Sequence, residues 1–381
     1  MNTAVKEDSI SLNGARVLVL GRSDAVLEAV LGELTALGID AQGTAEPEKA
    51  TERYDARNYD LIALGRGLLG EAGQSLKAQF RERNADVRLL DTYAPFAVYE
   101  IATALECSYP PNVDLEPYLA RIGSEGPMAP TLETLKELHE RHPDAIPFEA
   151  IDVLLERGVN IAPDAVEDKL VHGRRGGYCF EHNGLFKRVL EAIGFHVEGL
   201  SARVRWNAAP GTAPQPYSHM ALRVVVDNVP WLVDVGFGGC VLTTPLRMDT
   251  IEPQATSHET FRLIPFGPGM LLQMWIDEQW KPVYELSGEP RLEGDYEVAN
   301  WYTAEHPDSH FRRNLMVART STEARYTLLN GRYTVRYSDG RTHREVLEAD
   351  GIERVLADTF QLPVQPDWRP MIERAALLTE R

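Results

Sequence analysis

The chain has 381 residues, 44% of them apolar and 25% charged, with a net charge of −18. This length exceeds what one hydrophobic core usually serves, so we expect two or three domains of ordinary globular composition. The acidic charge would repel phosphate backbones and anionic membrane surfaces, which argues against nucleic acid and membranes as partners. No apolar run approaches the roughly 20 residues needed to cross a bilayer, and the first 14 residues lack a signal peptide's apolar stretch. We therefore expect a cytoplasmic protein.

Residues 15–106 predict a small parallel sheet covered by helices. Four short apolar runs alternate with helical patterns there, and Ser23 and Gly38 are suited to begin and end the first helix. Residues 107–114 contain two prolines and no periodicity, as in a linker. We place a first α/β domain at 1–109 and a second region at 113–381.

The first domain resembles a response-regulator receiver, a flavodoxin-like fold, in its order and size. The acidic residues that would hold magnesium and accept phosphate are replaced by Gly21-Arg22 and Leu64-Gly65. Gly21-Arg22-Ser23 offers a site for an anion at a helix start, but there is no GxGxxG. We favour a non-catalytic docking or stabilising module.

Three cysteines, Cys107, Cys179 and Cys240, lie far apart without CxxC spacing, which argues against disulfides and against a thiolate zinc site. The metalloprotease pattern HExxH is absent. Its nearest approach, His139-Glu140-Arg141-His142, has the wrong spacing, and we expect it on a solvated helix face. We therefore expect no metal.

Cys179 lies in the first turn of a predicted amphipathic helix that ends at Gly194. It follows two arginines and two glycines in the run RRGGYCFE, residues 174–181. The helix N-terminus and the arginines would favour thiolate over thiol, and the glycines would let a substrate approach. Cys179 is therefore a candidate nucleophile, although free cysteines are more often small buried hydrophobes.

Residues 218–226 and 229–235 predict a β-hairpin around the turn Asp227-Asn228. If residue 226 pairs with 229, Asp234 faces Ala221, two residues from His219. Side chains two apart share a face, so His219 and Asp234 become diagonal neighbours. His219 would then remove the thiol proton, Asp234 would orient its ring, and backbone N–H groups at the helix start would stabilise an oxyanion.

These motifs together resemble the arylamine N-acetyltransferase family. The resemblance rests on RRGGYCFE (174–181), SHMALRV (218–224) and PWLVDVGFGG (230–239), and extends from about residue 115 to the C-terminus. It implies a helical bundle (113–200), a β-barrel (201–290) and an α/β lid (291–381) around a Cys-His-Asp triad, here Cys179, His219 and Asp234. It also implies ping-pong transfer of an acetyl group from acetyl-CoA, through an acetyl-cysteine thioester, to an aromatic amine or hydrazine.

The resemblance assigns further residues of the site. Phe148 and Phe237 would line the acceptor pocket, Gly236 and Gly238 would give the pantetheine arm access, and Phe311 would close the site from the lid. Glu149 and Arg174 would form a buried ion pair that braces the cysteine loop. Ala150 stands where the family usually has Asn, and the first domain is no part of the usual arrangement.

Two alternatives stay open on the sequence alone. One is an amide synthase that joins a polyketide acyl chain, delivered by a carrier protein, to an aryl amine. The other is a regulatory binding protein whose triad no longer acts, with the first domain as a docking surface for another protein.

Overall fold

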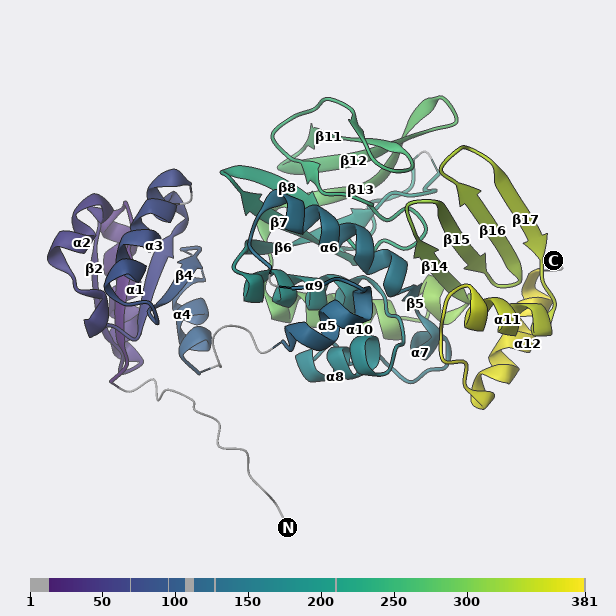
Figure 1. Ribbon diagram of the computed structural model, residues 1–381, viewed down its shortest axis with the longest axis horizontal. Helices are drawn as coiled ribbons and strands as arrows, with labels where there is room; N and C mark the ends of the chain where they lie inside the picture. The colour runs from purple at the N-terminus through teal and green to yellow at the C-terminus, as the bar shows by residue number, and fades with distance from the viewer. Residues whose placement is uncertain are drawn as a thin grey trace, which may run out of the picture. The chain divides into compact units, whose positions relative to one another are not determined.

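The computed structural model describes residues 14–379 except 69, 95, 107–112, 127 and 210. The expectations for the N-terminal segment, for Cys107 and for the proline-containing linker therefore lie largely outside the described residues. The chain divides into two compact units between Asn112 and Val113 (Figure 1).

The first unit is the predicted parallel α/β domain. Its strands are β1 (Arg16–Leu20), β2 (Asp40–Thr44), β3 (Leu61–Gly65) and β4 (Arg88–Thr92), all parallel in the order β2-β1-β3-β4. Its α-helices are α1 (Asp24–Ala36), α2 (Ala50–Arg53), α3 (Glu71–Arg83) and α4 (Ala97–Glu106). Apolar residues of α1 and α4 cover one face of the sheet and those of α2 and α3 the other. The two central strands, β1 and β3, are buried on both faces, as their apolar runs predicted.

The ends of α1 follow the predicted capping. The Ser23 hydroxyl accepts from the Val26 N–H, and Gly38 has a φ of 83°, a conformation that favours glycine. At the strand-to-helix turn, the Arg22 side chain donates to the Gly67 carbonyl and pairs with Glu48.

The second unit begins with helices around one apolar core. They are α5 (Leu115–Ile122), α6 (Leu132–Ala145), α7 (Ile151–Leu154), α8 (Pro163–Glu167), the π-helical turn η4 (Asp168–His172) and α9 (Cys179–Ile193). The apolar residues of α9 (Leu185, Phe186, Val189 and Leu190) are fully buried, and Gly194 ends the helix with a φ of 106°. Cys179, the candidate nucleophile, is therefore the first residue of a helix that is held in place by its buried apolar side.

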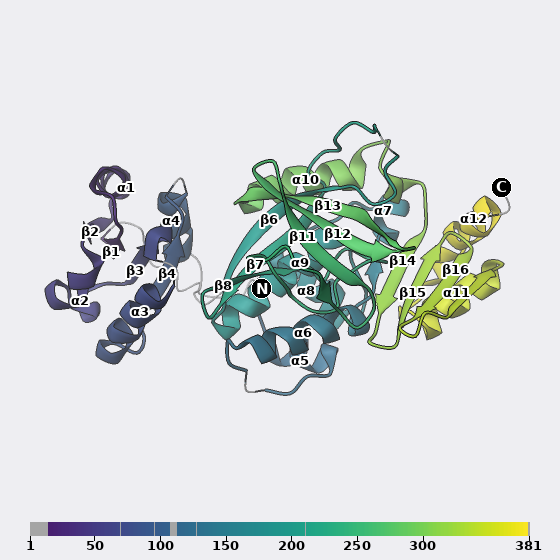
Figure 2. The same ribbon diagram turned by 90° about the horizontal axis from the view of Figure 1, so that it is seen from above.

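An eight-stranded antiparallel sheet curls into a nearly closed barrel beside these helices (Figures 1 and 2). Its order is β10-β11-β12-β13-β6-β7-β8-β9, with β6 (His196–Val204), β7 (His219–Val226), β8 (Val229–Val233), β9 (Leu246–Arg247), β10 (Gln254–Ala255), β11 (Thr260–Phe266), β12 (Gly269–Ile276) and β13 (Gln279–Pro290). Val226 pairs with Val229 across the turn, which is the predicted register. Helix α9 packs against β6 and β7, and the contact of Cys179 with the Ser218 carbonyl places its first turn near the start of β7.

The C-terminal part builds a second antiparallel sheet. Its strands are β14 (Met316–Thr320), β15 (Ala324–Leu329), β16 (Arg332–Tyr337) and β17 (Thr342–Val346), preceded by α10 (Glu293–Glu305) and the 3₁₀ turn η5 (His310–Arg312). Helices α11 (Ala349–Asp358) and α12 (Arg369–Thr379) cover one face (Figure 1). The short strand β5 (Phe148–Glu149) completes the sheet by pairing with β14, so the helical and C-terminal segments are joined through a shared sheet. No helix among the described residues is long and apolar enough to span a membrane.

Candidate active site

Cys179 is the first residue of α9 and is 5% exposed. Its Sγ lies 3.8 Å from the Ser218 carbonyl oxygen, immediately before His219. A side chain on Gly236 would place its Cβ only 2.8 Å from the Cys179 Cα. Glycine at 236 is therefore needed for the chain after β8 to pack against the start of α9. Its role in giving the pantetheine arm access, which the resemblance implies, stays a prediction.

His219 and Asp234 form the pair that the hairpin register predicted. The His219 Nε2 lies 2.7 Å from the Asp234 Oδ2, and both side chains are buried. With Nε2 engaged, Nδ1 is the ring nitrogen left for Cys179. The structure thus brings all three predicted residues together.

Burial disfavours the imidazolium, but Asp234, followed by the Cys179 sulfur, outweighs it and raises the pKa of His219 to about 10. The same contact, together with hydrogen bonds from Asn183 and Gly236, keeps the pKa of Asp234 below its usual value despite complete burial. An imidazolium between a carboxylate and a sulfur is therefore favoured near neutral pH.

Two further side chains, Asn183 and His139, hold Asp234, and neither was predicted to belong to the site. The Asn183 Nδ2 donates to the Asp234 Oδ1 at 3.0 Å and to the Met220 carbonyl at 2.8 Å. The Asp234 N–H donates to the His139 Nε2 at 3.2 Å, and burial lowers the pKa of His139 to about 4, so this ring stays neutral and accepts. Asn183 lies four residues after Cys179 on the same helix, a spacing that could have indicated it.

Aromatic side chains lie beside His219 and beside Tyr178, the residue before Cys179. Phe237 packs edge-on against His219 with ring centroids 5.0 Å apart. Phe148 and Phe311 lie 5.9 Å apart, and Phe311 also meets Tyr178, the residue before Cys179. Their side chains are half-buried. Phe148 also lies beside Gly238, whose φ of 78° favours glycine and whose Cβ would meet the ring at 3.3 Å.

The buried ion pair behind the cysteine loop uses Arg175 instead of Arg174. The Arg175 guanidinium contacts the fully buried Glu149 carboxylate at 2.7 Å and Asp152 at 3.1 Å. Arg174 has a φ of 52° and is exposed, so the turn there directs its side chain to solvent and that of Arg175 inward. The Glu149 Oε2 accepts from the Ile151 N–H at 2.8 Å, which satisfies the start of α7 where Ala150 offers no side-chain acceptor.

Lys169 extends this network to the start of α9. Its ammonium lies 2.8 Å from both Asp152 and Glu181, and the other Glu181 oxygen accepts from the Tyr178 N–H at 3.0 Å. Burial raises the pKa of Glu181, and Lys169 opposes that effect. The charged network therefore fixes the turn that carries Cys179.

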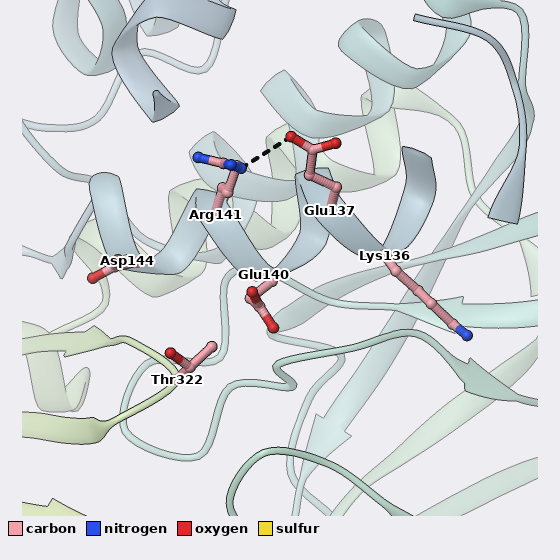
Figure 3. A pocket seen from close by; sticks show the side chains of 6 residues that line it. All are labelled: Lys136, Glu137, Glu140, Arg141, Asp144 and Thr322. Carbon is pink, nitrogen blue, oxygen red and sulfur yellow. Dashed lines mark ion pairs between the residues drawn. The ribbon is translucent and has the colours of Figure 1, made fainter. Parts of the chain in front are cut away.

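His139 and His142 are fully buried, which corrects the expectation of a solvated face for residues 139–142. Their spacing of three places both rings on the inner side of α6, whereas Glu140 and Arg141 are exposed. Glu140 and Arg141 line a depression of about 460 Å³. Lys136, Glu137, Asp144 and Thr322 also line it (Figure 3). It contains none of the predicted site residues. No cluster of metal-ligating side chains occurs in the described part of the chain.

Comparison with known proteins agrees with this geometry. The profile of the family described as N-acetyltransferase matches residues 131–369. The chain therefore belongs to the arylamine N-acetyltransferase family, with an additional α/β unit before it.

Similar proteins of known name are arylamine N-acetyltransferases. An arylamine N-acetyltransferase of Mycolicibacterium smegmatis is 42% identical over 61% of this chain and 85% of its own. An arylamine N-acetyltransferase / N-hydroxyarylamine O-acetyltransferase of Salmonella typhimurium is 39% identical over 66% of this chain and 89% of its own. The structure of a Mycobacterium marinum arylamine N-acetyltransferase in complex with CoA is 38% identical, with a TM-score of 0.66, over 69% of this chain and 98% of that one.

Proposed function

We propose that the protein transfers an acetyl group from acetyl-CoA to an aromatic amine or hydrazine through an acetyl-cysteine intermediate. The observation that carries this proposal is the buried His219–Asp234 pair beside Cys179 at the start of α9. The three residues match the nucleophile, base and orienting group of acyl transfer.

In the first half-reaction, His219 takes the Cys179 proton and the thiolate attacks the acetyl carbonyl of acetyl-CoA. The N–H groups of Cys179 and Phe180 belong to the first turn of α9, where N–H groups have no intrahelical acceptor, so they are the candidates to stabilise the oxyanion. The carbon–sulfur bond to CoA then breaks. The CoA thiolate leaves with the proton from His219, and Cys179 is left acetylated.

In the second half-reaction, the amine nitrogen attacks the thioester carbon while His219 accepts a proton from it. The bond from carbon to the Cys179 sulfur breaks, and the acetylated product leaves. Phe148, Phe237 and Phe311 are the proposed walls of the acceptor pocket. Phe237 packs against His219, Phe311 packs against the residue before Cys179, and Phe148 packs against Phe311. Their rings suit an aryl amine.

The proposed donor is supported by basic side chains on the lid sheet. Arg332, Arg336 and Arg344 line a depression of about 470 Å³ together with Thr327 and Thr334. A Cβ on Gly239 would lie 3.1 Å from the Thr327 side chain, so this face of the sheet adjoins the segment after Asp234. In a chain with a net charge of −18, a concave arginine cluster there suits the phosphates of CoA.

Intact-mass spectrometry after mixing with acetyl-CoA tests the proposal. We expect one acetyl group per chain in the wild type and in Cys240→Ser, which removes the other described cysteine, and none in Cys179→Ser. Addition of aniline should discharge the acetyl group as acetanilide. A wild-type chain that stays unacetylated, or a Cys179→Ser chain that turns over normally, would refute the mechanism. An unacetylated chain that accepts a carrier-bound acyl group would favour the amide synthase.

The cytoplasmic location and the docking role of the first unit stay predictions.

A further inference from the structure

A row of buried side chains joins three helices to the segment before Phe148. The Tyr118 hydroxyl of α5 lies 2.9 Å from the His142 Nδ1 of α6. The His142 Nε2 lies 2.9 Å from the His182 Nδ1 of α9, and the His182 Nε2 lies 3.2 Å from the Pro147 carbonyl oxygen. All three side chains have no solvent exposure.

The carbonyl at one end determines the direction of every hydrogen bond in the row. Because the Pro147 oxygen can only accept, the His182 Nε2 carries a proton and donates. In a neutral ring the His182 Nδ1 must then accept, so the His142 Nε2 donates to it and the His142 Nδ1 accepts from Tyr118. Burial lowers the pKa of His182 to about 4 and that of His142 well below its ordinary value, so both rings are neutral near pH 7.

His182 contacts the Phe148 segment in two ways. Its ring lies nearly parallel to the Phe148 ring, at 12° and 6.5 Å between centroids, while its Nε2 holds the carbonyl just before Phe148. On another side of that carbonyl, a Cβ on Gly176 would approach the Pro147 oxygen to 2.0 Å, so the segment has little room to shift. His182 is also one helical turn after Cys179.

We propose that the row Tyr118–His142–His182 fixes the distance between the Cys179 sulfur and the Phe148 wall, which makes His182 a positioning residue for the acceptor step. The proposal rests on the function proposed above. In ping-pong kinetics, kcat/KM for each substrate reports its own half-reaction. The row contacts the wall proposed for the amine, so its disruption should affect kcat/KM for the amine and spare kcat/KM for acetyl-CoA.

Two substitutions in the full-length chain test this. His182→Phe keeps a ring against Phe148 but removes both hydrogen bonds, and Tyr118→Phe removes only the hydroxyl at the far end. With aniline and 4-butylaniline as acceptors, we expect kcat/KM for the amine to fall about tenfold in His182→Phe and about threefold in Tyr118→Phe. The ratio between the two amines should change in both variants, and kcat/KM for acetyl-CoA should stay within about twofold.

Tyr296→Phe is the matched control, because this tyrosine is also buried but its hydroxyl has no hydrogen-bond partner among the described residues. It should leave both kinetic constants unchanged. An unchanged kcat/KM for the amine in His182→Phe would overturn the proposal. So would an equal fall in both constants, which would indicate a merely structural role. If His182→Phe does not fold, Tyr118→Phe decides by itself: an unchanged kcat/KM for the amine in that variant would overturn the proposal.

Long-range ¹H–¹⁵N correlation of the histidine rings gives an independent test on the wild-type protein. We expect His142 and His182 to be neutral at pH 7 with the proton on Nε2, and the His142 signals to move in Tyr118→Phe. A proton on Nδ1 of either neutral ring, or a charged ring, would refute the proposed hydrogen bonding of the row. Failure of the wild type to become acetylated would instead refute the proposed function, and the ring protonation would still decide whether the row exists.

Discussion

Substitution of Asp234 by Asn removes one charge and almost no volume from the proposed triad. The Asp234 Oδ1 accepts from the Asn183 amide and the Gly236 N–H, both at 3.0 Å, while the Oδ2 faces His219. An amide has one oxygen only. If that oxygen keeps the two donors from Asn183 and Gly236, the NH₂ group faces the His219 Nε2. The ring must then accept there and carry its proton on Nδ1, the nitrogen left for Cys179.

The magnitude follows from the pKa of His219. The rise from the ordinary 6.5 to about 10 corresponds to roughly 5 kcal/mol at 1.36 kcal/mol per pH unit. Without the carboxylate, only the weaker contribution of the Cys179 sulfur would oppose burial, so the pKa of His219 would fall and the imidazolium would be disfavoured. We expect the rate of Cys179 acetylation to fall about 10⁴-fold, the order of magnitude of the loss that the same change causes in Ser-His-Asp enzymes.

Rapid-quench mixing with acetyl-CoA followed by intact-mass spectrometry measures this rate in a single turnover. The control is Asp227→Asn in the turn of the same hairpin, because Asp227 is exposed and has a φ of 49°, which Asn tolerates. That control should react at the wild-type rate. A folded Asp234→Asn protein that is acetylated within tenfold of the wild-type rate would refute the role of the carboxylate.

Three further outcomes are expected. Arg175→Gln should lower the free energy of unfolding in urea by about 3–5 kcal/mol because it leaves the buried Glu149 charge without its guanidinium. Arg174→Gln should change it by less than about 0.5 kcal/mol, and equal effects would contradict the pairing. Because the pKa of His219 is raised, its stabilising contribution is complete below pH 6.5 and is lost as the pH rises through about 10. Between pH 6.5 and about 10, the melting temperature should therefore fall more in the wild type than in His219→Gln. Parallel curves of melting temperature against pH for the two proteins would refute this. Residues 113–381 alone should fold and keep kcat/KM within about threefold, since their three cores are self-contained and the CoA-bound relative is covered to 98% by 69% of this chain. A folded fragment that is not acetylated would show that the first unit helps to build the site.

The arrangement of Cys179, His219 and Asp234 could be predicted because each residue lies in a local pattern with fixed geometry. A two-residue turn determines the register of the hairpin, and that register places His219 and Asp234 on one face. The position of Cys179 follows from the start of an amphipathic helix whose apolar side and final glycine are visible in the sequence. The parallel order of the first unit follows in the same way from its alternating strands and helices.

The parts that could not be predicted depend on single backbone angles or on distant pairings. Whether Arg174 or Arg175 faces Glu149 is decided by the left-handed φ of Arg174, which no periodicity indicates. The two-residue strand β5 is too short to show alternation, and its partner β14 lies far along the chain. The polar sequence of residues 139–142 suggested a solvated face, although their spacing from Leu135 and Leu138 places both histidines inward.

The contacts at the start of α9 explain why the nucleophile is held by several independent constraints. Glu181 accepts the N–H of Tyr178 and is paired with Lys169, so the turn before Cys179 is fixed from the helical side. Gly236 lets the chain after β8 pack against the Cys179 backbone, so the turn is also fixed from the barrel side. In the proposed mechanism the Cys179 thiolate meets first a thioester and then an amine. One fixed position serves both half-reactions, because reaction rates depend steeply on the alignment of the reacting atoms. The charged network and the glycine contacts provide that position before either substrate binds, so in the proposed mechanism the aromatic walls are left to select the acceptor.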